Sequence, residues 1–62
     1  MTRISVVIPT LNNERTIRIA AKSALSVADE VIVVDSYSTD RTVELAEKEG
    51  AKVIQVKGSR LI

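Results

Sequence analysis

The chain has 62 residues, a formal net charge of +1, and neither cysteine nor histidine. This length allows one small domain over residues 1–62, and the composition excludes disulfides, thiolate metal sites and a histidine general base. The balanced charge and single tyrosine argue against a nucleic-acid surface, and no apolar run approaches the roughly 20 residues of a transmembrane segment, so a cytoplasmic protein is expected.

The first half of the chain predicts a strand followed by a helix. β-Branched residues dominate residues 3–8, and Pro9 should end that strand. After a polar turn, apolar residues recur every three or four positions over about 14–26, which predicts a helix with one buried stripe. Ile19 lies among the basic residues of the opposite face, where a polar residue is expected.

The second half predicts strand, helix and strand again. Four consecutive β-branched residues, 31–34, are typical of a strand covered on both faces. A helix is predicted over about 40–49, with Ser38 or Thr39 as its N-cap, and residues 52–56 form the third predicted strand.

This alternation predicts an α/β fold with a three-stranded parallel sheet, in the order β-α-β-α-β and resembling half of a Rossmann fold. Right-handed crossovers and a 3-2-1 strand order would place both helices on one face of the sheet. The other face would be left uncovered, and it would be apolar, because the strand residues of both sides are: Ile4, Val6 and Ile8 on one and Val7 on the other, Val31 and Val33 on one and Ile32 and Val34 on the other. We therefore expect that face to pack against a further domain or a second copy in a homo-oligomer.

Ligands of open α/β sheets bind beyond the carboxyl ends of the strands, where loops 9–14 and 35–40 should meet. Each loop leads into a helix N-terminus, which favours anions. The only glycines are Gly50 and Gly58, so the chain has neither a dinucleotide-binding fingerprint nor a P-loop.

Two motifs carry a family resemblance: Val-Ile-Pro-Thr near the start, and Val-Val-Asp-x-x-Ser-x-Asp-x-Thr about twenty-five residues later. Together, at this separation, they resemble the N-terminal part of family 2 glycosyltransferases, which have the GT-A fold. The likeness covers residues 4–56. It implies a glycosyltransferase that uses a UDP- or GDP-sugar.

The resemblance also implies site residues. The backbone at Pro9 and Thr10 and the carboxylate of Glu14 would lie along the base and ribose, and Asp35 would accept hydrogen bonds from one of them. The full set of nucleotide-binding residues that it implies is Pro9, Thr10, Asn12, Glu14, Asp35 and Tyr37. Asp40 would instead order its loop and the second helix.

No catalytic residue, metal ligand or cofactor site is expected in this chain. The family's Asp-x-Asp motif, which would hold Mg²⁺ or Mn²⁺ in the full-length enzyme, and its catalytic base are expected beyond residue 62. We therefore expect the 62-residue chain alone to be inactive.

Three positions depart from the family pattern. Asn12 stands where an aromatic residue or lysine is common, Ser36 where a second aspartate is frequent, and Tyr37 where glycine is common. If the backbone at Tyr37 needs a positive φ, that residue is strained.

Other interpretations remain open. Asp35 could be a solvated strand-end residue, Glu14 a favourable acid in a helix first turn, and Asp40 a capping residue. The chain could be a catalytically inactive, oligomeric scaffold module. A receiver-like α/β domain ranks last, because the paired acids expected after its first strand are missing.

Overall fold

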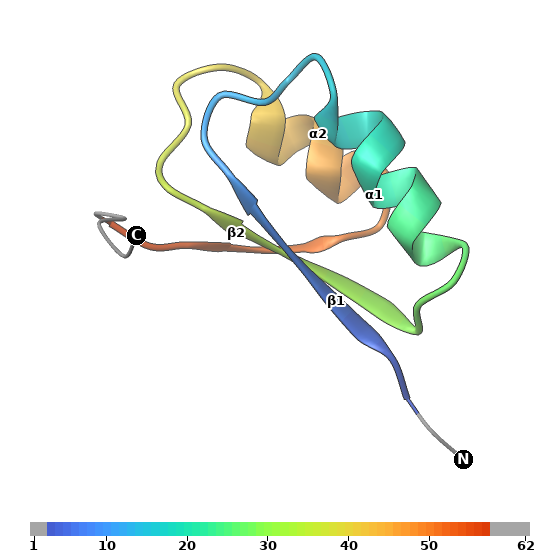
Figure 1. Ribbon diagram of the computed structural model, residues 1–62. Coiled ribbons are helices and arrows are strands. Elements are labelled where there is room, and N and C mark those ends of the chain that lie inside the picture. Colours follow the sequence, from blue (N-terminus) through green and yellow to red (C-terminus); the bar gives the residue numbers. More distant parts are fainter. Residues whose placement is uncertain (1–2, 58–62) are drawn as a thin grey trace.

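The computed structural model describes residues 3–57. Its elements, in chain order, are β1 (Ser5–Thr10), α1 (Ile17–Leu25), β2 (Glu30–Asp35), α2 (Thr42–Lys48) and β3 (Lys52–Gln55). The strands form one three-stranded sheet in the order β1-β2-β3, and both neighbouring pairs are parallel (Figure 1). The predicted α/β fold and strand order are confirmed.

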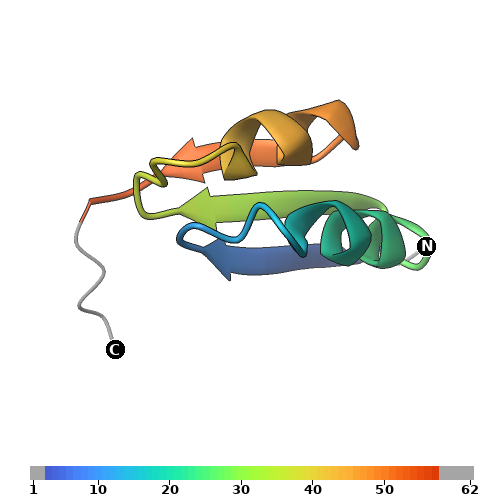
Figure 2. The ribbon, with the colours of Figure 1, turned by 90° about the horizontal axis from the view of Figure 1, so that it is seen from above.

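Both helices cover the same face of the sheet, as the right-handed crossovers required (Figures 1 and 2). The core lies between the two layers and centres on Ile17 of α1, Val31 and Val33 of β2, and Ala46 of α2. Burial alternates along β2, so Val31, Val33 and Asp35 point toward the helices. The last of these is a carboxylate at the end of the core-facing row.

The opposite face of the sheet is apolar and uncovered in this part of the chain. Val7 is 58% exposed and Ile54 is 52% exposed. In the strand register Val7 lies beside Ile32, and Ile54 lies beside Val34, so these side chains form one apolar surface. The expectation of an uncovered apolar face is confirmed, and the identity of its partner remains a prediction.

The first strand continues through Pro9 to Thr10, so the prediction that Pro9 ends it was wrong. The carbonyls of Ile4 and Thr10 accept hydrogen bonds from the β2 side. Because N–H and C=O groups alternate in direction along a strand, the nitrogen of Pro9 points away from β2. A proline in an edge strand loses no hydrogen bond when its nitrogen faces outward.

Both helices begin later than predicted. Residues 14–16 form a turn, in which the N–H groups of Thr16 and Ile17 both donate to the carbonyl of Asn13, and α1 begins at Ile17. The helix α2 begins at Thr42 instead of residue 40, and neither Ser38 nor Thr39 is its N-cap. The Asp40 carboxylate accepts from the Thr42 N–H at 2.9 Å instead.

No helix within residues 3–57 is long and apolar enough to cross a membrane.

Candidate functional site at the carboxyl ends of β1 and β2

The two loops predicted to hold the site lie at the same edge of the sheet. Thr10 ends β1, Asp35 ends β2, and the two residues are paired in the strand register. The loops 11–16 and 36–41 therefore leave the sheet side by side (Figure 2). The parallel arrangement on which the site depends is present.

Asp35 is fully buried, and its carboxylate is surrounded by donors. One oxygen accepts from the Thr10 hydroxyl at 2.6 Å and from the Ser38 hydroxyl. The other accepts from the Ser38 N–H at 2.7 Å and from the Gln55 amide at 3.3 Å. One carboxylate thus ties the ends of all three strands to the β2–α2 loop, so Asp35 is not a solvated strand-end residue.

The protonation state of Asp35 follows from these contacts. Burial alone would raise its pKa, but the hydrogen bonds from Ser38, Thr10 and Gln55 together lower the pKa below its ordinary value. A carboxylate whose charge is stabilised by several donors stays ionised near neutral pH. Asp35 is therefore an acceptor only.

Asn12 links the two loops directly. Its N–H donates to the Ser38 hydroxyl at 2.8 Å, and its side-chain oxygen accepts from the Thr39 N–H at 2.8 Å. The backbone of Asn12 has a φ of 53°, in the left-handed region that asparagine tolerates better than most residues. This cross-loop bonding gives Asn12 a structural role in addition to the one that the resemblance implied.

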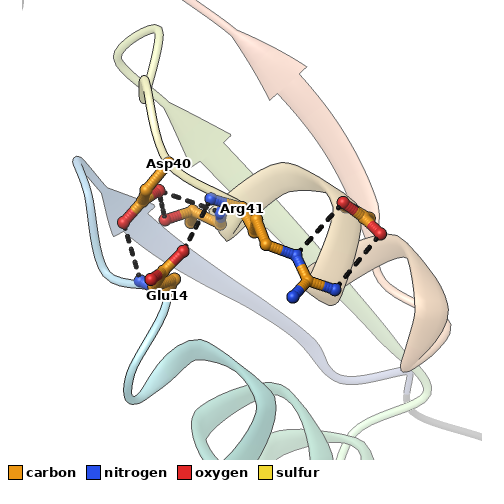
Figure 3. A network of polar contacts seen from close by, with 5 residues as sticks. Glu14, Asp40 and Arg41 are labelled. Atoms are coloured by element: carbon orange, nitrogen blue, oxygen red, sulfur yellow. Dashed lines mark hydrogen bonds and ion pairs between the residues drawn. The ribbon is translucent and has the colours of Figure 1, made fainter.

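Glu14 and Asp40 form a reciprocal pair across the same two loops (Figure 3). The Glu14 N–H donates to the Asp40 carboxylate at 3.1 Å, and the Glu14 carboxylate accepts from the Arg41 N–H at 2.9 Å. The small burial of Asp40 would raise its pKa, but hydrogen bonds, first those from Thr42, lower it below the ordinary value. Asp40 orders the loop and the start of α2, as expected.

Thr42 is a structural residue that the sequence analysis missed. Its side chain is fully buried; its hydroxyl accepts from the Asn13 N–H at 2.8 Å and donates to the Asp40 carboxylate. Ser38 and Gln55, which bind Asp35, were missed as contacts in the same way. For Ser38 and Thr42, the only signal in the sequence was the polar spacing Ser-x-Asp-x-Thr. Nothing in the sequence indicated Gln55.

Tyr37 and Pro9 lie at the surface. Tyr37 is 54% exposed and has a φ of 57°, so the expected positive φ at this glycine-like position is present. Pro9 is exposed at the edge of the sheet, beside the uncovered face. The structure thus brings Thr10, Asn12, Glu14 and Asp35 into the hydrogen bonds that join the two loops, and it leaves the side chains of Tyr37 and Pro9 outside them.

The acidic residues of this region do not form a metal centre by themselves. Within residues 3–57 no three side chains of the metal-binding types lie close enough together to hold an ion. The carboxylates of Asp35 and Asp40 are already committed to loop hydrogen bonds.

Comparison with known proteins agrees with this architecture. The profile of Glycosyl transferase family 2 matches residues 5–60, and the chain belongs to that family. An uncharacterized glycosyltransferase of Rickettsia bellii is 54% identical over 52 residues, which are 84% of this chain and 18% of that protein. Glucosyl-3-phosphoglycerate synthase of Petrotoga mobilis is 45% identical over 58 residues, covering 82% of this chain and 18% of that protein.

Solved structures show the same fold. Glucosyl-3-phosphoglycerate synthase from Mycobacterium tuberculosis, in complex with phosphoglyceric acid, has a TM-score of 0.77 at 43% identity, over 86% of this chain and 21% of that one. The same synthase in complex with Mn²⁺, UDP-glucose and phosphoglyceric acid has the same TM-score, identity and coverage. The three strands and two helices are therefore part of a GT-A fold, and the chain spans about a fifth of the length of these relatives.

Proposed function

We propose that this chain forms the nucleoside-facing part of a glycosyltransferase that takes a UDP- or GDP-sugar as its donor. The observation that carries the proposal is the hydrogen-bonded pair of loops at the carboxyl ends of β1 and β2, held together through Asp35 and Asn12. Open α/β sheets bind their ligands at this edge. UDP is the first candidate, because solved structures of the similar synthase hold UDP or UDP-glucose.

Several groups of the two loops remain open to a ligand. Among residues 3–57, Asn12 uses its side-chain oxygen, which leaves its amide nitrogen as a donor, and Glu14 uses one carboxylate oxygen, which leaves the other as an acceptor. The side chain of Tyr37, in the β2–α2 loop, is 54% exposed. Such groups can bind the N–H and O–H groups of a base and ribose.

Asp35 and Thr10, unlike Asn12 and Glu14, contribute to the proposed site mainly by holding the loops. Both are buried, and their side chains bond to one another, so a nucleoside reaches the Asp35 carboxylate only if Ser38 or Gln55 gives up its bond. Their first role is to hold the loops in position. Direct contact of either side chain with the base or ribose remains a prediction.

The divalent ion expected of the full-length family, Mg²⁺ or Mn²⁺, would neutralise the diphosphate leaving group. Residues 3–57 do not form a site for it among themselves. The contribution that we propose for these residues is therefore binding and orientation of the nucleoside.

Amide chemical shifts test this proposal. The chain is titrated with UDP, UDP-glucose and GDP, and with ADP to detect unspecific phosphate binding. We expect shifts at Thr10, Glu14 and Asp35, with none at Ala28 and Ala51, which precede β2 and β3 at the opposite edge of the sheet. Unchanged spectra at millimolar UDP and GDP, or equal shifts with ADP, would contradict the proposal.

A second candidate function is an oligomeric scaffold without catalytic activity. It rests on the uncovered sheet face, where Val7 and Ile54 are each more than half exposed. Exposed apolar surface of this kind is typical of protein–protein contacts. Light scattering on the purified chain would show a dimer or larger assembly, and a stable monomer at micromolar concentration would argue against this candidate.

A further inference from the structure

A groove of about 560 Å³ lies between α1 and α2 and reaches the residues before each helix, where Glu14, Arg15 and Arg41 line it. We call it the helix groove. Its cationic lining consists of Arg15, Arg18, Lys22 and Arg41. All four residues are exposed, so their charges face solvent.

The carboxylates of the helix groove do not neutralise these cations. Only two acidic residues line it, Glu14 and Glu49. Glu14 accepts from the Arg41 backbone, and Glu49, whose side chain is 19% exposed, accepts from Nε of Arg18 at 3.2 Å. Arg18 keeps its terminal guanidinium nitrogens available, since this ion pair uses only Nε.

The other three cations of the groove, Arg15, Lys22 and Arg41, have no strong ion pair among the described residues. Within residues 3–57 neither Arg15 nor Lys22 belongs to an ion pair. Arg41 pairs with Glu44 at 3.5 Å, but both side chains are more than half exposed, and such pairs contribute little. The helix groove therefore carries an excess of positive charge that is open to a partner.

The groove also offers apolar contacts. Ile19 is 71% exposed in the middle of the cationic side chains, and Leu45 of α2 lies half-buried in the lining. A small inorganic anion would make no use of Ile19. An apolar side chain surrounded by arginines and a lysine matches a partner that has both carboxylates and an apolar anchor.

We propose that the helix groove binds an acidic, amphipathic segment of a partner protein. The part of α1 that carries this lining, from Ile17 to Lys22, rises about 7.5 Å at 1.5 Å per residue, so the groove accommodates between one and two turns of a helical segment. Carboxylates of the segment pair with the cations, and one apolar side chain packs on Ile19 and Leu45. This surface shares Glu14 with the proposed nucleoside site and extends away from it along α1 and α2.

A binding assay with a defined probe tests the proposal. The probe is a short fluorescent peptide of glutamate and leucine with its leucines at helical spacing, and the control peptide has lysine in place of glutamate. We expect the acidic peptide alone to bind, with an affinity that falls as salt is added. The double variant Arg15→Glu/Lys22→Glu should lose about tenfold or more, because attraction becomes repulsion at two points.

Two further variants separate the apolar contribution to binding from the effect of a charge change outside the groove. Ile19→Ser should weaken binding severalfold, because it removes the apolar anchor. Lys48→Glu makes the same change of charge at an exposed residue outside the groove and should leave the affinity within about twofold.

The proposal is overturned if the double variant binds the acidic peptide as well as the unmodified chain does, or if the acidic peptide does not bind at all. Binding to vesicles of phosphatidylcholine and phosphatidylserine without binding to the peptide would also overturn it, since it would identify a membrane surface. A circular dichroism spectrum of each variant, matched to that of the unmodified chain, shows that the fold is retained.

Discussion

Replacing Asp35 tests the central claim that one buried carboxylate holds the site together. Asp35→Ala removes the acceptor of four hydrogen bonds, from Thr10, from Ser38 twice and from Gln55. Hydrogen bonds to charged groups contribute about 1.5–3 kcal/mol each, and buried donors left unpaired cost further free energy, although such terms are not additive. We expect the free energy of unfolding to fall by about 3–5 kcal/mol.

This loss is large for a chain of this size. At about 0.05–0.15 kcal/mol per residue, a chain of 62 residues has a free energy of unfolding of about 3–9 kcal/mol. Asp35→Ala should therefore remove between about a third and all of this free energy of unfolding. The assay is urea unfolding followed by far-ultraviolet circular dichroism.

Asp35→Asn is the matched control. Its amide oxygen can accept from the Ser38 N–H and the Gln55 amide, and its NH₂ group can donate to the Thr10 and Ser38 hydroxyls, which are able to reverse their roles. Each of the four groups keeps a partner, but the charge is lost and the Thr10 and Ser38 hydroxyl protons lose their acceptor. We expect a cost of about 1–2 kcal/mol.

The pH dependence separates the variants further. The pKa of Asp35 is lowered in the folded chain, so its stabilising contribution is fully present above the unfolded value of 3.8 and is lost as pH falls through the folded pKa. The unmodified chain should lose stability over this acidic range more steeply than Asp35→Asn. Equal losses for the alanine and asparagine variants, or an alanine variant within about 1 kcal/mol of the unmodified chain, would refute the reasoning.

Three other tests have definite expected outcomes. Tyr37→Gly relieves a positive φ and should raise the free energy of unfolding by up to about 1 kcal/mol, whereas Asn12→Gly loses the bond to Thr39 and should lower it; thermal unfolding distinguishes the two. Thr42→Val leaves the Asn13 N–H without its acceptor and should cost about 1–3 kcal/mol in urea unfolding, more than Thr42→Ser, which keeps the hydroxyl. The purified chain should show no sugar transfer from UDP-glucose in a product assay; turnover by the chain alone would contradict the division of roles proposed above.

Element boundaries show where reading the sequence failed. Pro9 stops a strand only when its nitrogen faces a partner strand, and that orientation depends on the register with β2. The starts of α1 and α2 were predicted too early because the polar residues before them bond across to the other loop instead of beginning a helix. A pattern along one segment contains no information on such partners.

The candidate site was likewise predicted only in part. The meeting of the two loops was predicted from their position after the strands, and Thr10, Asn12, Glu14 and Asp35 do take part in the bonds between them; their contacts with a nucleotide stay a prediction. The bonding partners Ser38, Thr42 and Gln55 were not predicted, because serine, threonine and glutamine are ordinary in loops and strand ends.

The order of elements, the parallel sheet, the placement of both helices on one face and the uncovered apolar face all follow from the sequence alone. They depend on the local periodicity of apolar residues, which can be read along the sequence, and on the right-handedness of crossovers, which is common to proteins of L-amino acids. Only the tertiary structure decided that the Asp35 carboxylate is buried and fully bonded, and that Glu14 and Asp40 bind across the loops. The bonds from Thr10 to Asp35, from Glu14 to Asp40 and from Arg41 to Glu14 join residues 25 to 27 positions apart, and such partners meet only after the strands have paired.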